Sequence, residues 1–186
     1  MGDLVQALQL IDRADKYRDS QDIADYKRHY FVHAYILYQL HDYEKYEEAL
    51  TLLKKAIALD SKYHAAVFLK YNVEAILFTA SFDEQFSNLE TYYIQHIKPT
   101  GDNALIGDYF QSLGLLYSRY EKYDKAIKAL EKAEKHQHCE ANIANIAIAY
   151  YFWAVEKNQK GDILHRANID YTKMLKMYGN VDRAPV

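Results

Sequence analysis

The sequence predicts an all-α fold of about nine antiparallel helices, in which consecutive helices pack against each other. Glycine (6 residues) and proline (2 residues) are scarce among the 186 residues, so turn residues are too few for a sheet of many short strands. Apolar residues instead recur at helical spacing along the chain. A repeated pattern of small and large residues then predicts how the helices pair.

The expected helices follow from runs of helical periodicity that are separated by short polar breaks. Asp60 and Asp102 are expected to cap the helices that follow them, and Ser81 with Glu84 has the spacing of a capping box. The Lys-Pro-Thr-Gly run at residues 98–101 predicts a loop. The expected helices lie near residues 3–16, 22–40, 43–58, 62–79, 83–97, 103–119, 123–136, 140–157 and 162–178.

The clearest helix pair lies at residues 109–136. One face of its first helix, at positions i, i+3, i+4 and i+7, consists of Phe110, Leu113, Gly114 and Tyr117. After a break at residues 121–123, one face of the second helix consists of Ala126, Leu130 and Ala133. The small residues Gly114 and Ala126 predict a close crossing of the two helices, with the larger residues filling the space beside it.

The same spacing recurs along the chain. The second-helix face is repeated by Ala49, Leu53 and Ala56, again by Ala7, Ile11 and Ala14, and more weakly by Ala167, Tyr171 and Met174. The first-helix face is repeated by Ile143, Ile146, Ala147 and Tyr150. Residues 62–98 keep the periodicity, through Leu69, Val73, Ile76 and Leu77, but lack the small residues. These residues resemble the tetratricopeptide repeat (TPR) family, most closely at 107–140 and clearly at 30–60.

The TPR resemblance implies a right-handed superhelix and one helical-repeat domain over residues 1–186. The helix at 3–16 is of the second type and has no first-type helix before it, so its apolar face is expected to be half uncovered. From this start, the chain is expected to be the C-terminal part of a longer protein. A self-contained protein with an irregular first cap is the alternative.

Composition favours a protein that acts by binding other polypeptides. Lysine and arginine (23) nearly balance aspartate and glutamate (26) and are interleaved with them, which argues against direct nucleic-acid contact. No apolar run is long enough for a membrane span, and the single Cys139 favours a reducing cytoplasm. The 19 tyrosines suit partly hydrated contact surfaces, although many such rings are expected simply to fill gaps between helices.

No residue pattern predicts an enzyme or a cofactor. His29 and His33 have a spacing that can hold a metal, and His136, His138 and Cys139 lie close together in sequence, but neither group supplies a full ligand set. Phosphate-binding glycine loops and nucleophile elbows are absent from the sequence. The lysines of residues 122–135 alternate with acids and are interpreted as a mixed, solvated surface.

The TPR resemblance implies a peptide-binding groove on the concave side, lined by the first helix of each pair. Carried onto this sequence, its positions are Asp108, Gln111, Leu115 and Arg119 on one helix, Ala144, Asn145, Ile148, Tyr151 and Phe152 on the next, and Ala34 and Tyr38 earlier in the chain. Gln111 and Asn145 are the best candidates for contacts to a peptide backbone, because a carboxamide both donates and accepts hydrogen bonds. The carboxylate clamp of chaperone-binding TPR proteins is absent at the equivalent positions.

The architecture also resembles the C-terminal TPR domains of peptide-sensing regulators from Gram-positive bacteria. That resemblance implies a quorum-sensing type of regulator, in which a short peptide bound in the groove changes the action of an effector domain. The alternative is a scaffold or adaptor that joins proteins without a small signal. Homodimerisation is left open.

Because neither histidine group has a full ligand set, we expect zinc or a chelator to leave the melting temperature unchanged. Differential scanning calorimetry with and without each additive would check this. A metal that copurifies in stoichiometric amount would contradict it.

Overall fold

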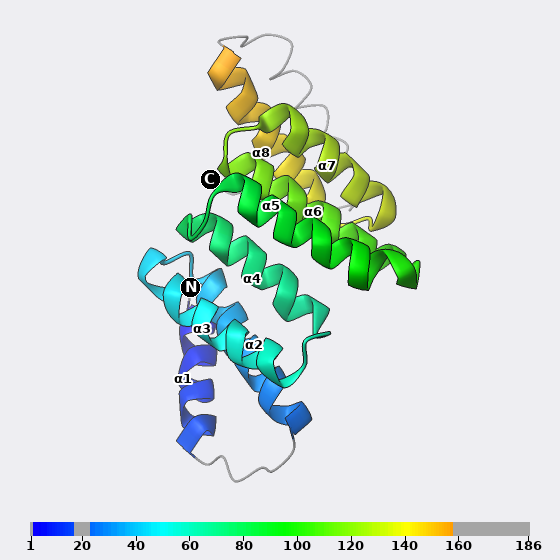
Figure 1. The fold of residues 1–186 in the computed structure, drawn as a ribbon. Coiled ribbons are helices and arrows are strands. Elements are labelled where there is room, and N and C mark those ends of the chain that lie inside the picture. The colour runs from blue at the N-terminus through cyan, green and yellow to red at the C-terminus, as the bar shows by residue number, and fades with distance from the viewer. Residues whose placement is uncertain (1, 17–22, 158–186) are drawn as a thin grey trace. The chain divides into compact units, whose positions relative to one another are not determined.

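The computed structural model describes residues 2–16 and 23–157, and within them it contains helices and no strand (Figure 1). The helix expected at 162–178, with Ala167, Tyr171 and Met174, lies outside the described residues. The chain divides into two compact units, residues 1–81 and 82–186. Each unit is described by itself.

The helices begin and end close to their expected positions. The first unit contains α1 (Gly2–Lys16), α2 (Ile23–Gln39), α3 (Tyr43–Leu59) and α4 (His64–Leu77). The second contains α5 (Phe82–Tyr92), a π-helical turn (Tyr93–Ile97), a 3-10 turn (Lys98–Thr100), α6 (Asn103–Arg119), α7 (Tyr123–His136) and α8 (Glu140–Lys157). Within the part of the chain that the structure describes, no helix is both long and apolar enough to cross a bilayer.

The core of the first unit forms where α3 packs between α2 and α4 (Figure 1). Ala49, Leu53 and Ala56 of α3 are completely buried there, which confirms the expected second-helix face. α4 contributes the small Ala66, which is completely buried, together with the larger Leu69 and Val73. The Asp42 carboxylate caps α3 by accepting a hydrogen bond from the Glu44 amide at 3.1 Å.

The first helix, α1, is covered on one side by the rest of the first unit. Leu8 packs against the core of that unit, whereas Val5 is 48% exposed and Leu10 is 56% exposed. Of the face that the sequence assigned to this helix, Ala7 and Ile11 are half-buried, and the side chain of Ala14 lies outside the described residues.

The second unit is organised by the close crossing of α6 and α7. A Cβ atom built on Gly114 would lie 2.5 Å from Cγ of Leu130 and 3.3 Å from the carbonyl oxygen of Ala126. Leu130 is completely buried, so it has little room to move away. Ala126 and Ala133 are also fully buried. The small residues thus bring two helix backbones together, as the sequence predicted.

The next helix, α8, packs on the other side of α7. Ile146, Ala149 and Tyr150 of α8 form a core with residues of α7, and Ile143 is buried as well. The buried Asn142 at the start of α8 donates a hydrogen bond from Nδ2 to the Gln137 carbonyl oxygen at 2.9 Å, which fixes the loop between the two helices. Three residues of the expected inner face, Ile143, Ile146 and Tyr150, are buried as predicted, whereas the fourth, Ala147, is only half-buried.

The helix caps agree with the sequence at one aspartate and differ at the other. Asp102 caps α6 and accepts hydrogen bonds from the Ala104 and Leu105 amides at 2.8 and 3.3 Å. Asp60 does not cap α4, because that helix begins later and Tyr63 occupies its N-cap position. The Asp60 carboxylate instead accepts hydrogen bonds from the Lys62 amide and from Lys27 of α2.

The α2–α3 and α6–α7 pairs turn in the same way. In each turn, the residue two positions beyond the helix end has a positive φ, 52° at His41 and 59° at Glu121. At Glu121, the following Lys122 amide donates a hydrogen bond back to the Tyr117 carbonyl oxygen at 2.9 Å. A left-handed residue after the last helical turn is a common way to end a helix and reverse the chain.

We expect Gly114→Leu to lower the free energy of unfolding by about 1–3 kcal/mol or more, because its side chain has no space between α6 and α7. Urea denaturation monitored by circular dichroism would measure this. Ala104→Leu is the matched control, since Ala104 lies on the same helix with an exposed side chain. Equal stability of the two variants would contradict the prediction.

Candidate functional site

The candidate peptide site consists of two stripes of residues, one on α6 and one on α8. α6 is the first helix of the α6–α7 pair, α8 follows that pair, and α6 and α8 contact each other. We call the two stripes together the α6–α8 face; its residues are Asp108, Gln111, Leu115, Arg119, Ala144, Asn145, Ile148, Tyr151 and Phe152. The spacing of three and four residues keeps the side chains of the α6 stripe on one side of that helix, whereas the α8 stripe is broader because it contains two adjacent pairs, 144–145 and 151–152.

Four polar side chains of the α6–α8 face have no partner among the described residues. Asp108, Gln111, Arg119 and Asn145 neither donate to nor accept from another described side chain or backbone group. Arg119 is exposed and the other three are half-buried. Half-buried polar groups without partners are sites where a ligand can add hydrogen bonds.

The carboxyl group of Asp108 lies in an unfavourable place for a negative charge. Burial raises the pKa of the Asp108 carboxyl, and the nearby negative charge of Asp102 raises this pKa further. A positively charged or hydrogen-donating ligand group at this position would relieve both effects.

The apolar members of the α6–α8 face remain accessible. Ile148 and Tyr151 are each 52% exposed and Phe152 is 47% exposed, whereas Leu115 and Ala144 are half-buried. The Phe152 ring stacks on Tyr123 at the start of α7, with 6.0 Å between centroids and 15° between planes. It also meets the Tyr151 ring edge-on at 5.4 Å. Phe152 is therefore held in place at the edge of the accessible apolar surface.

The expected groove residues of the first unit do not all reach the surface. Ala34 is completely buried in the core of that unit, so the expectation that it lines a groove is wrong. Ala34 lies five residues before the end of α2, as Gly114 does in α6, and it therefore occupies the small-residue position of the helix pair. Tyr38 is half-buried and its ring contacts His41 and Tyr46. The exposed aromatic side chain of α2 is Tyr35.

The two histidine groups take part in packing contacts. His33 is buried, and its ring lies edge-on to that of His29 with 6.3 Å between centroids. His136 stacks on Phe110 and lies 3.1 Å through Nδ1 from Oδ1 of Asn103. Nδ1 of His138 contacts the Glu134 carboxylate. Among the described residues, no three His, Cys, Asp or Glu side chains form a cluster of the kind that holds a metal.

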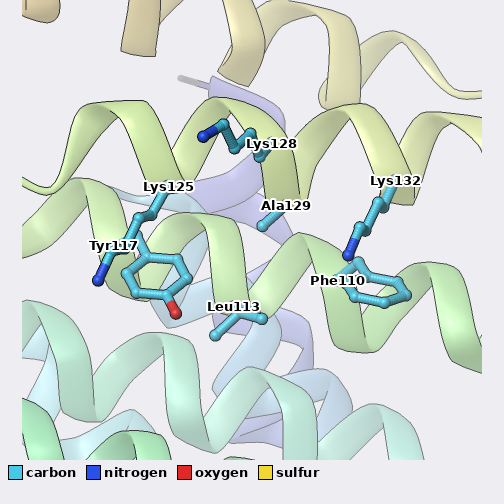
Figure 2. Close-up of a pocket in the computed structure, with 7 residues that line it drawn as sticks. All are labelled: Phe110, Leu113, Tyr117, Lys125, Lys128, Ala129 and Lys132. Atoms are coloured by element: carbon cyan, nitrogen blue, oxygen red, sulfur yellow. The ribbon is translucent and has the colours of Figure 1, made fainter.

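A second candidate surface, not expected from the sequence, lies between α6 and α7. Figure 2 shows Leu113 and Ala129 between two ring–lysine contacts, Tyr117 with Lys125 and Phe110 with Lys132. The open cavity measures about 200 Å³. We call it the lysine groove; its residues are Phe110, Leu113, Tyr117, Lys125, Lys128, Ala129 and Lys132.

The signal for the lysine groove is present in the sequence but depends on the helical register. Lys125, Lys128 and Lys132 follow each other at spacings of three and four residues and so share one side of α7. Asp124 and Glu131 lie four and three residues from Lys128, on a neighbouring part of the same helix surface, but they do not line the groove.

We expect Asp108→Asn to raise the free energy of unfolding at pH 7. The raised pKa of Asp108 means that ionisation costs the folded state, so the wild-type protein loses stability as pH rises above the ordinary value of 3.8. The gain from the substitution should therefore disappear as pH falls toward 3.8. Urea titrations from pH 3.5 to 7 would measure the difference, with the exposed Glu131→Gln as control. A pH-independent gain would contradict the prediction.

Comparisons with known proteins identify a fold and no family. No protein-family model matches the chain, and no curated protein sequence matches it. Among solved structures, "MamA 41-end from Desulfovibrio magneticus RS-1" is similar with a TM-score of 0.54 and 20% identity, over 98% of this chain and 89% of that one. "MamA RS-1 ArsTM double mutant" is similar with a TM-score of 0.54 and 19% identity, over 95% of this chain and 86% of that one.

At this level of identity the likeness shows the fold alone. It agrees with the helix pairs described above: the chain has an all-α, TPR-like fold of stacked antiparallel helices.

Proposed function

We propose that the chain is a binding module without enzymatic activity, and that its α6–α8 face holds an extended peptide or a segment of a partner protein. The observation that carries this proposal is the combination of polar side chains without partners and accessible aromatic and aliphatic side chains. Packing within the folded chain does not account for these polar side chains or for the accessible apolar ones. A peptide ligand would use both, because it offers backbone donors and acceptors together with side chains.

The carboxamides of Gln111 and Asn145 support a backbone-directed mode of binding. Each offers one acceptor and two donors, so it can pair with both the amide and the carbonyl group of an extended peptide. The accessible Ile148, Tyr151 and Phe152 can cover peptide side chains, and aromatic rings contribute large contact areas at low entropic cost. Backbone pairing gives affinity for many sequences, and the apolar surface selects among them.

The charges of the α6 stripe give the ligand a direction. Asp108 and Arg119 are separated by eleven residues of one helix, or about 16 Å at 1.5 Å per residue. An extended peptide of about five residues covers this length. Its positively charged amino end would lie beside Asp108, and its carboxylate would pair with the Arg119 guanidinium.

The finer form of the proposal is a regulator of the quorum-sensing type, in which the ligand is a short signalling peptide. Binding to two helix pairs at once would favour one relative arrangement of those pairs over another. An effector domain would respond to that change in population. The alternative is an adaptor, in which the same face holds a segment of a protein partner and carries no signal.

Removal of one carboxamide tests the proposed face. We expect Asn145→Ala to weaken binding by about tenfold to a hundredfold, since unpaired peptide groups cost roughly 1–3 kcal/mol. The probe is a pool of five- to eight-residue peptides from the host, measured by mass-resolved equilibrium dialysis and then individually by calorimetry. The melting temperature should be unchanged, because the Asn145 side chain holds no other described residue.

The controls separate this face from other surfaces. Gln95→Ala removes an exposed carboxamide from the π-helical turn and should leave binding unchanged. Arg119→Gln should weaken peptides with a free carboxylate and spare those with an amidated end. The proposal would be contradicted by a ligand that binds Asn145→Ala as tightly as it binds the wild type. It would also be contradicted by a ligand whose binding is lost only in lysine-groove variants. Binding confined to whole proteins would favour the adaptor.

A further inference from the structure

We propose that the lysine groove is a second binding site, and that it takes an acidic segment of a partner protein, with one apolar side chain inserted between carboxylates. This inference does not depend on the α6–α8 face, because the groove is formed by a different side of α6 and by α7.

The residues that line the lysine groove carry positive charge and no negative charge. Three of its seven residues are lysines, no carboxylate lines it, and none of the three ammonium groups forms an ion pair with a described carboxylate. Glu90 and Asp124 lie close enough to raise the pKa of Tyr117, after the larger effect of burial, but neither reaches the groove. Carboxylates on a partner would therefore meet three ammonium groups that form no ion pair with a described carboxylate.

Aromatic rings hold two of the ammonium groups along the groove. The Lys125 Nζ lies 5.9 Å from the centroid of Tyr117, and the Lys132 Nζ lies 5.2 Å from that of Phe110. Just beyond the groove, the Lys122 Nζ lies 3.2 Å from the centroid of Phe82, a ring that also stacks on Tyr117. Cation–π contacts reduce the freedom of the lysine side chains, so less entropy remains to be lost on binding.

The apolar side chains at the base of the lysine groove limit which ligand groups can enter it. Leu113 and Ala129 lie between the two rings, and the rings themselves are half-buried (Figure 2). A volume of about 200 Å³ is smaller than the roughly 300–1,000 Å³ of small-molecule sites, and it suits one inserted side chain. The groove therefore combines an apolar anchor point with flanking positive charges.

A protein segment fits these features better than nucleic acid or the chain's own C-terminal residues. A phosphate backbone needs a continuous basic track, whereas Asp124 and Glu131 follow beside the lysines, and the net charge is −3. Residues 158–186 contain five basic residues (Lys160, Arg166, Lys173, Lys176, Arg183) against three acidic ones (Asp162, Asp170, Asp182). That segment lacks the required negative charge.

The test uses the full chain and three fluorescein-labelled peptides. One alternates Glu and Asp around a central Phe, one has Ala in place of this Phe, and one has Lys in place of every acid. Fluorescence anisotropy should show binding of the first peptide, weaker binding of the second and none of the third, with affinity that falls as salt rises. Charge reversal of the groove, K125E/K128E/K132E, should weaken the first peptide at least tenfold.

Matched variants make the result specific. The control K54E/K98E/K135E changes the net charge by the same amount at exposed lysines outside the groove and should bind normally. Lys132→Met keeps the contact with Phe110 but removes the charge, and it should weaken binding without lowering the melting temperature. Asn145→Ala should have no effect on these peptides, so failure of the α6–α8 face and failure of the groove remain distinguishable.

Three outcomes would overturn the inference. Equal losses in the groove triple and the control triple would show attraction to net charge alone. A single-stranded oligonucleotide that displaces the acidic peptide and binds more tightly would make the groove a nucleic-acid site. Self-association of the wild-type chain in light scattering, abolished by the groove triple, would assign the groove to a second copy of this chain.

Discussion

The close approach of Gly114 to Leu130 determines the geometry of the second unit. Because Gly114 has no side chain, the backbones of α6 and α7 approach closely where they cross. That approach places the lysine stems of α7 beside the rings of α6, and it leaves the opposite side of α6 to the polar stripe from Asp108 to Arg119. The packing of α8 on α7 then completes the surroundings of the candidate face. If the backbones of α6 and α7 lay farther apart where they cross, the residues that form each candidate surface would be separated.

Most of the fold was predictable because it depends on local sequence. Helical periodicity and scarce turn residues located the helices, and the Ala-Leu-Ala spacing identified the completely buried face in both α3 and α7. Asp102 shows the same principle at a helix end, since an aspartate directly before an apolar run satisfies free backbone amides. These features involve residues within a few turns of each other, so pattern alone reveals them.

The errors concern contacts between distant residues. Asp60 was expected to cap α4, but Lys27, 33 residues away, pairs with its carboxylate, and α4 begins later. Ala34 was placed in a groove, but counted from the end of α2 it matches Gly114, the small residue at the helix crossing. The lysine groove was missed because its rings come from another helix. For the α6–α8 face, sequence supplied the candidate residues, whereas the structure revealed that its four polar side chains have no partner among the described residues.

The chain's single tryptophan lies on α8, between the α7–α8 core and the candidate α6–α8 face. Trp153 is half-buried against the α7–α8 core, its ring is 6.4 Å from that of Tyr150, and it directly follows Phe152 of the candidate face. With 19 tyrosines and one indole, light absorbed by nearby tyrosines can pass to a single emitter. The protein thus carries its own optical probe: Trp153 emission would report solvent entry into the α7–α8 core and would also report a ligand bound beside Phe152.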